Sequence, residues 1–224
     1  FNNKEKPKDT TSKSVFYNYA IISDDCNKAA LPVYMSETYS KVYYLNNPER
    51  EKVVINAVNS NSLADVETFM LTQLIQKNTK YNFYDNYVKI FDKNFISPIS
   101  ILGRLYYKYY LVDSLFIDNN YCYEIQVKPR RKEDLTFTGT LWINDTSFAI
   151  KRISVEVDKQ ADINFIKRIK IQQDFNKTQA GVWFPSKTRI LSDAVNIFIN
   201  SYTVNNNFYT NNEYPLSFTI RNLL

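Results

Sequence analysis

Hydrophobic and polar positions alternate one by one through most of the second half of the chain. Successive side chains of a β-strand point to opposite faces of its sheet, so a period of two predicts strands with one apolar face. In the run 149–157 the apolar register also contains Lys151. The predicted strands are 121–128, 137–143, 149–157, 169–175, 182–190 and 195–204.

The connections between these strands are short and polar, as at Asn144-Asp145 and Asn176-Lys177. Such turns join antiparallel neighbours, whereas parallel strands need long crossovers. Strand following strand without helices between them therefore indicates an antiparallel sheet and not a βαβ fold. Its apolar face must be covered by a second sheet, by closure or by helices.

The first half of the chain is less regular. A strand is predicted from Leu31 to Leu45, and Asn46-Asn47-Pro48 ends it as a turn. The run 51–59 reads as a short strand or a helical turn, because its apolar core is too brief to separate the two. Residues 1–14 are polar and are expected to form a flexible leader, with 15–224 as a single domain.

One helix is predicted, at 62–77, where apolar residues recur at steps of three and four. Ser62 suits the N-cap, and Asn78 is a plausible stop. We expect this helix to pack in the concave face of a curved sheet and to leave an apolar cleft between them, of the kind that holds lipid-like ligands. The residues expected to line the cleft are Leu63, Val66, Phe69, Met70 and Leu74, with Trp142 or its strand neighbours.

The amino-acid composition excludes several kinds of catalytic and binding site. The chain has no histidine and three scattered glycines, Gly103, Gly139 and Gly181. Acid–base triads, most zinc sites, phosphate-cradling loops and dinucleotide fingerprints are therefore excluded. The net charge of +5, from 28 Lys+Arg against 23 Asp+Glu, is too small to indicate nucleic acid. We expect no catalytic residue, no metal and no cofactor.

No segment has the roughly 20 uninterrupted apolar residues of a membrane helix. The most apolar region, 105–117, contains Lys108 and Asp113. Cys26 and Cys122 allow one disulfide but do not require it. Cys122 falls in an alternating strand, where a small buried hydrophobe is the preferred interpretation.

The charged residues offer only weak candidate sites. Ser186 and Lys187 are adjacent in a strand, so their side chains point to opposite faces. The basic stretch 128–132 suits phosphate head groups, but Glu133 and Asp134 follow it and a solvated loop is preferred. No spacing fixes a catalytic pair among the strand and turn carboxylates Glu124, Asp145, Glu156 and Asp174.

Several segments carry a family resemblance. They are Leu31–Glu37, Phe95–Ser100, Tyr107–Ser114, Pro129–Lys132 and Phe137–Asp145 with Phe148–Ile150. On these segments the chain resembles a Bacteroidetes family of unknown function, whose members are usually described as carboxypeptidase-regulatory-like domain-containing proteins. The Ser-Pro and Gly-x-x-Trp-Ile pieces are the most specific.

In such proteins a small β-sandwich typically precedes this region and an outer-membrane β-barrel is expected after it. The resemblance implies a fragment of a larger protein on the periplasmic side of the outer membrane, with its own downstream barrel as a partner. It transfers no catalytic residue, because the family's name refers to the separate sandwich and this chain lacks the histidine ligands of a zinc carboxypeptidase.

The C-terminal half is also similar to the lipoprotein-localisation (LolA/LolB-like) fold. The pieces that carry this second likeness are Phe137-x-Gly139-x-Leu141-Trp142-Ile143, Ile150-x-x-Ile153, Ile169-x-Ile171 and Gly181-x-Trp183-x-Pro185. That fold is an incomplete barrel closed by helices around an acyl-chain cavity, which agrees with a helix packed under a curved sheet.

These observations favour a β-dominated α+β domain, built as a curved antiparallel sheet with the 62–77 helix in its concave face. The expected function is that of a non-enzymatic periplasmic module that binds an acyl-chain or lipoprotein ligand at the outer membrane, as a monomer and without nucleic acid. The alternative is a structural or interaction domain that anchors or gates the downstream barrel without a small ligand. An undetected hydrolase is a third hypothesis.

Overall fold

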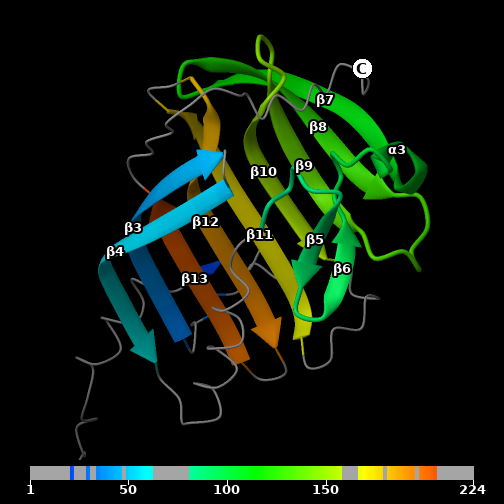
Figure 1. Ribbon diagram of the computed structural model, residues 1–224. Helices are drawn as coiled ribbons and strands as arrows, with labels where there is room; N and C mark the ends of the chain where they lie inside the picture. Colours follow the sequence, from blue (N-terminus) through cyan, green and yellow to red (C-terminus); the bar gives the residue numbers. More distant parts are fainter. Residues whose placement is uncertain are drawn as a thin grey trace, which may run out of the picture.

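The structure is a computed structural model that describes residues 21–22, 29–30, 34–46, 49–62, 81–157, 166–178, 181–194 and 197–205. Strands dominate these ranges (Figure 1). In chain order the elements are β1 (Ile21–Ile22), β2 (Ala29–Ala30), β3 (Tyr34–Asn46), β4 (Glu49–Ser62), β5 (Tyr87–Ile90), β6 (Lys93–Ile96), α3 (Gly103–Tyr106), β7 (Tyr107–Ile117), β8 (Asn120–Pro129), β9 (Phe137–Asn144), β10 (Ile150–Val157), β11 (Ile166–Lys177), β12 (Trp183–Ala194) and β13 (Ile197–Asn205).

Nine strands of the described residues form one sheet in the order β4-β3-β13-β12-β11-β10-β9-β8-β7. From β7 to β13, each strand pairs antiparallel with the next along the chain. The β3–β4 hairpin extends the sheet through a parallel pairing of β3 with β13. Strands β4 and β7 stand at the two ends of this order, so the sheet is open.

The sheet is strongly twisted and bent (Figure 1). The pairing registers shift between Tyr39 and Ser40, between Leu111 and Asp113, and between Ile150 and Arg152. An extra residue on one strand of an antiparallel pair bends that strand and increases its local twist. These bulges therefore bend the sheet, and the β5–β6 hairpin lies in front of one side of it, which we call the inner face (Figure 1).

The inner face carries the hydrophobic core. Because strand side chains alternate between faces, residues opposite one another in register share a face. Ile125, Leu141 and Ile153 lie side by side across β8, β9 and β10, and all three are buried. The buried core residues on the strands of this nine-stranded sheet are Tyr107, Ile125, Val127, Phe137, Leu141, Ile143, Ile150, Ile153, Val155, Val157, Ile169, Ile171, Phe175 and Ile190.

Residues 81–100, which we call the cover segment, pack on this core. The ring of Phe137 on β9 contacts Phe83 and Phe95 of the cover segment, with ring centroids 5.7 and 5.4 Å apart. The ring of Tyr84 meets Phe175 on β11 edge-on at 6.0 Å. Aromatic pairs of this geometry stabilise packing beyond the area they bury. The apolar inner face is thus covered over β9–β11.

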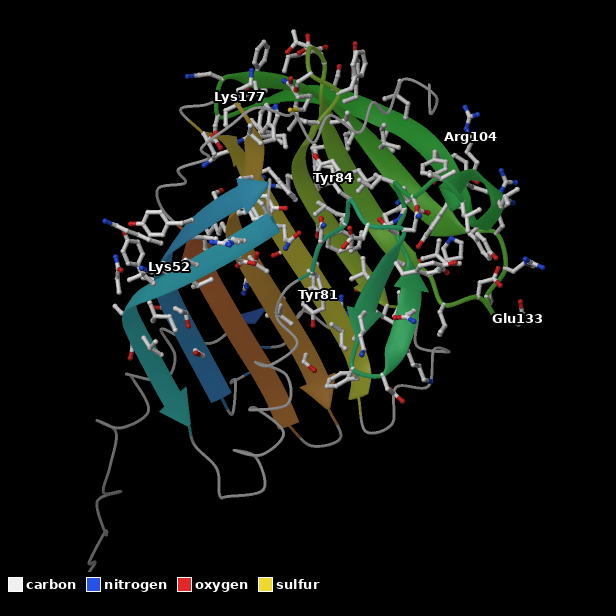
Figure 2. All side chains as sticks on the ribbon, viewed as in Figure 1. Lys52, Tyr81, Tyr84, Arg104, Glu133 and Lys177 are labelled. Carbon is white, nitrogen blue, oxygen red and sulfur yellow. The ribbon has the colours of Figure 1, made fainter. Side chains whose placement is uncertain are left out.

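Polar groups fix the position of the cover segment across the sheet (Figure 2). The backbone N–H of Ile150 donates to the hydroxyl of Tyr84 at 3.1 Å, and the side-chain amide of Gln173 donates to the carbonyl of Tyr81 at 2.9 Å. Burial raises the pKa of both tyrosines to about 12. These hydroxyls therefore stay protonated over the physiological range.

The sequence-based prediction of a β-dominated antiparallel fold is confirmed, and the six strands predicted after Tyr121 are β8–β13. The ambiguous run 51–59 is strand, within β4. Residues 1–14 and residues 63–77 of the predicted helix lie outside the described residues, and Ser62 is the last residue of β4. The described element on the inner face is the cover segment, which the hydrophobic pattern did not predict.

We expect Tyr107→Phe to lower the free energy of unfolding by about 2 kcal/mol, because two buried backbone groups lose their partner. The fully buried hydroxyl of Tyr107 donates to the carbonyl of Ile96 and accepts the N–H of Phe137 at 3.0 Å. Urea unfolding measures the change. Tyr110→Phe is the control, since Tyr110 is 45% exposed; an equal effect of the two changes would contradict this role for Tyr107.

Candidate functional site

The inner face stays open along the β7–β8 hairpin. Leu111 and Phe116 of β7 lie opposite Ile125 and Tyr121 of β8. Ile125 belongs to the core, and the alternation along β8 places Tyr121 on the same face. Leu111 and Phe116 are nevertheless 61% and 71% exposed. With Tyr121 and Tyr123 they form an accessible surface, which we call the apolar strip.

The rings of the apolar strip form a continuous surface that runs out from the core. Tyr123 packs against the core cluster, its ring lies 6.1 Å from that of Tyr121, and Tyr121 lies 5.0 Å from Phe116. The hydroxyls of Tyr121 and Ser114 are 2.7 Å apart and hydrogen-bonded, which fixes the Tyr121 ring. Such a surface can bury hydrocarbon with little loss of side-chain freedom.

The turn between β7 and β8 fixes which residues of the two strands lie opposite each other in the apolar strip. Asp118 and Asn119 both have positive φ, at 46° and 62°. Two left-handed residues make a type I′ turn, whose twist matches that of the flanking strands, and Asn and Asp tolerate this conformation best among residues with a side chain. Phe116 and Tyr121 are thereby held opposite each other.

The cleft-lining residues expected from the sequence are only partly placed by the structure. Leu63, Val66, Phe69, Met70 and Leu74 lie outside the described residues.

Trp142 is described, but it lies on the outer face of the sheet. Its indole N–H donates to Glu124 at 3.3 Å, and the guanidinium of Arg152 lies 6.0 Å from its ring centroid. Its strand neighbours Leu141 and Ile143, 1% and 2% exposed, face the core. The neighbours, and not Trp142, therefore contribute to the inner face.

The outer face is a row of ion pairs. Arg152 pairs with Asp174 on β11, and Arg168 pairs with Glu156 at 2.7 Å. Cross-strand pairs of opposite charge stabilise a solvated sheet face modestly. Two of the four carboxylates considered for a catalytic pair, Asp174 and Glu156, are thus paired with arginines, and the outer face has the character of a solvated surface.

Lys151 is a buried cation, only 2% exposed. Its ammonium donates to the Phe175 carbonyl at 3.1 Å and to the Asn176 side chain at 2.7 Å, and pairs with Asp118 at 3.1 Å. A lysine is almost never buried without such partners. Its three N–H donors are matched by three acceptors from the β7–β8 turn and the end of β11. Lys151 therefore links the β7–β8 turn to the end of β11.

We expect Lys151→Met to lower the free energy of unfolding by about 2 kcal/mol, since the Phe175 carbonyl and Asn176 lose their donor. Asp118→Asn should cost less than about 0.5 kcal/mol, because the Asp118 side chain is 75% exposed. Thermal and urea unfolding of both variants measure the difference. Equal losses would show that the surface ion pair, and not the buried contacts, carries the stability.

Cys122 is a free, buried thiol. Its Sγ donates weakly to the Asn120 carbonyl at 3.4 Å, and burial raises its pKa, opposed by the nearby Lys151. A raised pKa disfavours the thiolate that nucleophilic or redox chemistry requires. Cys122 therefore packs as a small hydrophobe, as the sequence predicts; Cys26 lies outside the described residues.

Two further observations concern the described residues alone. No group of three or more His, Cys, Asp or Glu side chains in them is arranged to hold a metal ion. Among the same residues, no helix has the length and apolar character needed to cross a bilayer.

Comparison with known protein families identifies a match over most of the chain. A family model described as "Family of unknown function (DUF5686)" matches residues 5–214. No curated protein and no solved structure matches the chain significantly.

Proposed function

Since the chain belongs to DUF5686, a family of unknown function whose model spans residues 5–214, we propose a function from the site itself. The chain is a non-enzymatic module that binds a hydrophobic or lipidated ligand on the inner face of its sheet. Its proposed place is the periplasmic side of the outer membrane, next to its own downstream barrel. In this proposal the sheet is an incomplete barrel of the lipoprotein-localisation type, with residues 63–77 of the predicted helix as part of its lid.

The observation that carries the proposal is the apolar strip. An open sheet buries its core under the cover segment but leaves Leu111 and Phe116 mostly exposed on the same face. Burying apolar surface contributes about 0.8 kcal/mol per methylene, so an acyl chain laid along β7 and β8 would gain several kcal/mol before association costs. The ion pairs of β10 and β11 lie on the outer face, which favours hydrocarbon on the inner one.

A titration with anthroyloxy-labelled stearic acid tests the proposal. We expect saturable binding by the wild-type chain, and at least a roughly tenfold weaker affinity for Phe116→Asp, because the carboxylate would be desolvated against the acyl chain. Ile55→Asp is the matched control, since Ile55 is 60% exposed on β4 at the far end of the sheet. Absence of binding, or equal weakening by both changes, would contradict the proposal.

The second candidate is an interaction domain that anchors or gates the downstream barrel. Strand β4 supports it: residues 50–59 are all exposed on this terminal strand, and Val53, Ile55 and Val58 are among them. A long apolar edge strand is a template for pairing with another strand. Amide hydrogen exchange would distinguish the candidates, because only this one predicts slower exchange in β4 when the downstream barrel is present.

A further inference from the structure

A second exposed apolar group lies at the other end of β7, around the short helix α3. Ile101, Leu102 and Leu105 are 70%, 36% and 67% exposed. They stand in a series of tight turns, in which the Gly103 N–H donates to Ser100 and the Leu105 N–H donates to Leu102. Tyr107 and Ile117 are the two ends of the 11-residue strand β7, so this group is separate from the apolar strip.

The packing of Gly103 decides which way these side chains point. A Cβ at Gly103 would lie 2.6 Å from the Tyr109 hydroxyl and 2.9 Å from the Pro98 carbonyl, so this side of the turn is pressed against the protein. With 100° between successive residues of a helical turn, Ile101 and Leu105 lie opposite Gly103. The turn therefore presents two large aliphatic side chains outward, with Arg104 beside them.

Cations surround this apolar tip. The guanidinium Nε of Arg130 donates to the carbonyls of Arg104 and Tyr107 at 3.1 and 2.9 Å, which holds the stretch after β8 beside α3. Residues 101–108 and 128–134 together hold six cationic side chains against two carboxylates, and all six are exposed. The cations are Arg104, Lys108, Lys128, Arg130, Arg131 and Lys132.

One of the two carboxylates is already neutralised within the group. Asp134 pairs with Arg131 at 3.1 Å, and Arg131 remains 66% exposed. Figure 2 shows Arg104 and Glu133 on the same side of the molecule, at the β7 end of the sheet. The corner therefore presents an excess of positive charge around an aliphatic tip.

From this arrangement we infer that the α3 corner, residues 101–108 with 128–134, docks on an anionic lipid bilayer. Peripheral anchors combine apolar side chains that enter the acyl boundary with Lys and Arg that remain among the head groups. The basic residues of this corner are exposed, which suits the diffuse charge of a membrane. A protein partner would need a shaped pocket around each anchor. Docking here leaves free the part of the apolar strip formed by Phe116 and Tyr121, at the other end of the β7–β8 hairpin.

Vesicle co-sedimentation of the full 224-residue chain tests the inference. We expect binding to vesicles with 30 mol% phosphatidylglycerol in phosphatidylcholine, and at least tenfold weaker partitioning on pure phosphatidylcholine or in 0.5 M salt. The double change Ile101→Asp with Leu105→Asp should weaken binding to the anionic vesicles at least tenfold. The change Arg131→Glu with Lys132→Glu should weaken it several-fold and reduce its salt dependence.

Ile55→Asp again serves as the control, and circular dichroism checks that each variant is folded. Because the altered side chains at the corner are exposed, folding should not change. The inference is overturned if the wild-type chain does not sediment with anionic vesicles, which would leave an acidic protein as the partner of this corner. It is equally overturned if the corner variants bind as well as the wild type.

Discussion

Gly139→Ala is expected to lower the free energy of unfolding by about 3 kcal/mol or more, although it adds a single methyl group. A Cβ at Gly139 would lie 2.1 Å from the Ser154 carbonyl oxygen and 2.7 Å from the Val155 Cα. Both atoms belong to the backbone of β10, which pairs with β9 at this point. The strands would have to separate in the middle of the sheet, because no side chain can move aside to make room.

The matched control is Gly181→Ala. Gly181 has φ of 79°, but a Cβ there would meet nothing within 4 Å. Gly181→Ala is therefore expected to lower the free energy of unfolding by only about 1 kcal/mol, the cost of placing a residue with a side chain in the left-handed conformation. Urea unfolding monitored by tryptophan fluorescence would compare the two variants. A loss at Gly139 no larger than that at Gly181 would contradict the close approach of β9 and β10.

Phe137→Ala is expected to lower the free energy of unfolding by about 4 kcal/mol, the usual cost of removing a fully buried ring. Phe137 is 0% exposed and contacts both Phe83 and Phe95. It is the residue through which the cover segment packs on β9. We therefore also expect faster hydrogen exchange across residues 81–100 in this variant.

Phe116→Ala is the control for Phe137→Ala. It removes the same side chain from a position that is 71% exposed, so it should cost less than about 1 kcal/mol. Equal losses would mean that the cover segment does not depend on Phe137. A large loss at Phe137 without faster exchange in residues 81–100 would mean that the ring stabilises only the sheet.

The strands from β8 to β13 could be predicted because each has one buried and one solvated face, which produces a period of two. Strand β7 has no such pattern. Tyr110, Leu111 and Val112 are all exposed at the edge of the sheet, and the bulge after Leu111 interrupts the alternation. The parallel pairing of β3 with β13 joins residues more than 150 positions apart, and no local pattern encodes it.

Of the cleft residues expected from the sequence, Trp142 alone falls in the described part of the chain, and the apolar strip was not among the expected residues. The alternation in β9 itself separates Trp142 from Leu141 and Ile143, so the pattern already assigned the tryptophan to the opposite face. The N–H and ring of Trp142 contact Glu124 and Arg152 on that face. Exposure, which marks Leu111 and Phe116 as accessible, depends on the cover segment and cannot be read from spacing.

Lys151 shows a second limit of what can be predicted from the sequence. The sequence places it in the apolar register of 149–157, and the structure shows that it is 2% exposed at the bulge between Ile150 and Arg152. The acceptors that make this burial tolerable come from Asp118 and Asn176, each more than 20 positions away in the chain.

Native mass spectrometry of the purified chain, followed by organic extraction, tests the central claim most directly. The proposed function predicts a stoichiometric acyl-chain adduct that is present in the wild type and in Ile55→Asp, and absent from Phe116→Asp. A clean apo mass for the wild type, with no adduct after incubation with fatty acid, would contradict it. That result would leave the edge of β4, and a partner strand, as the basis of the function.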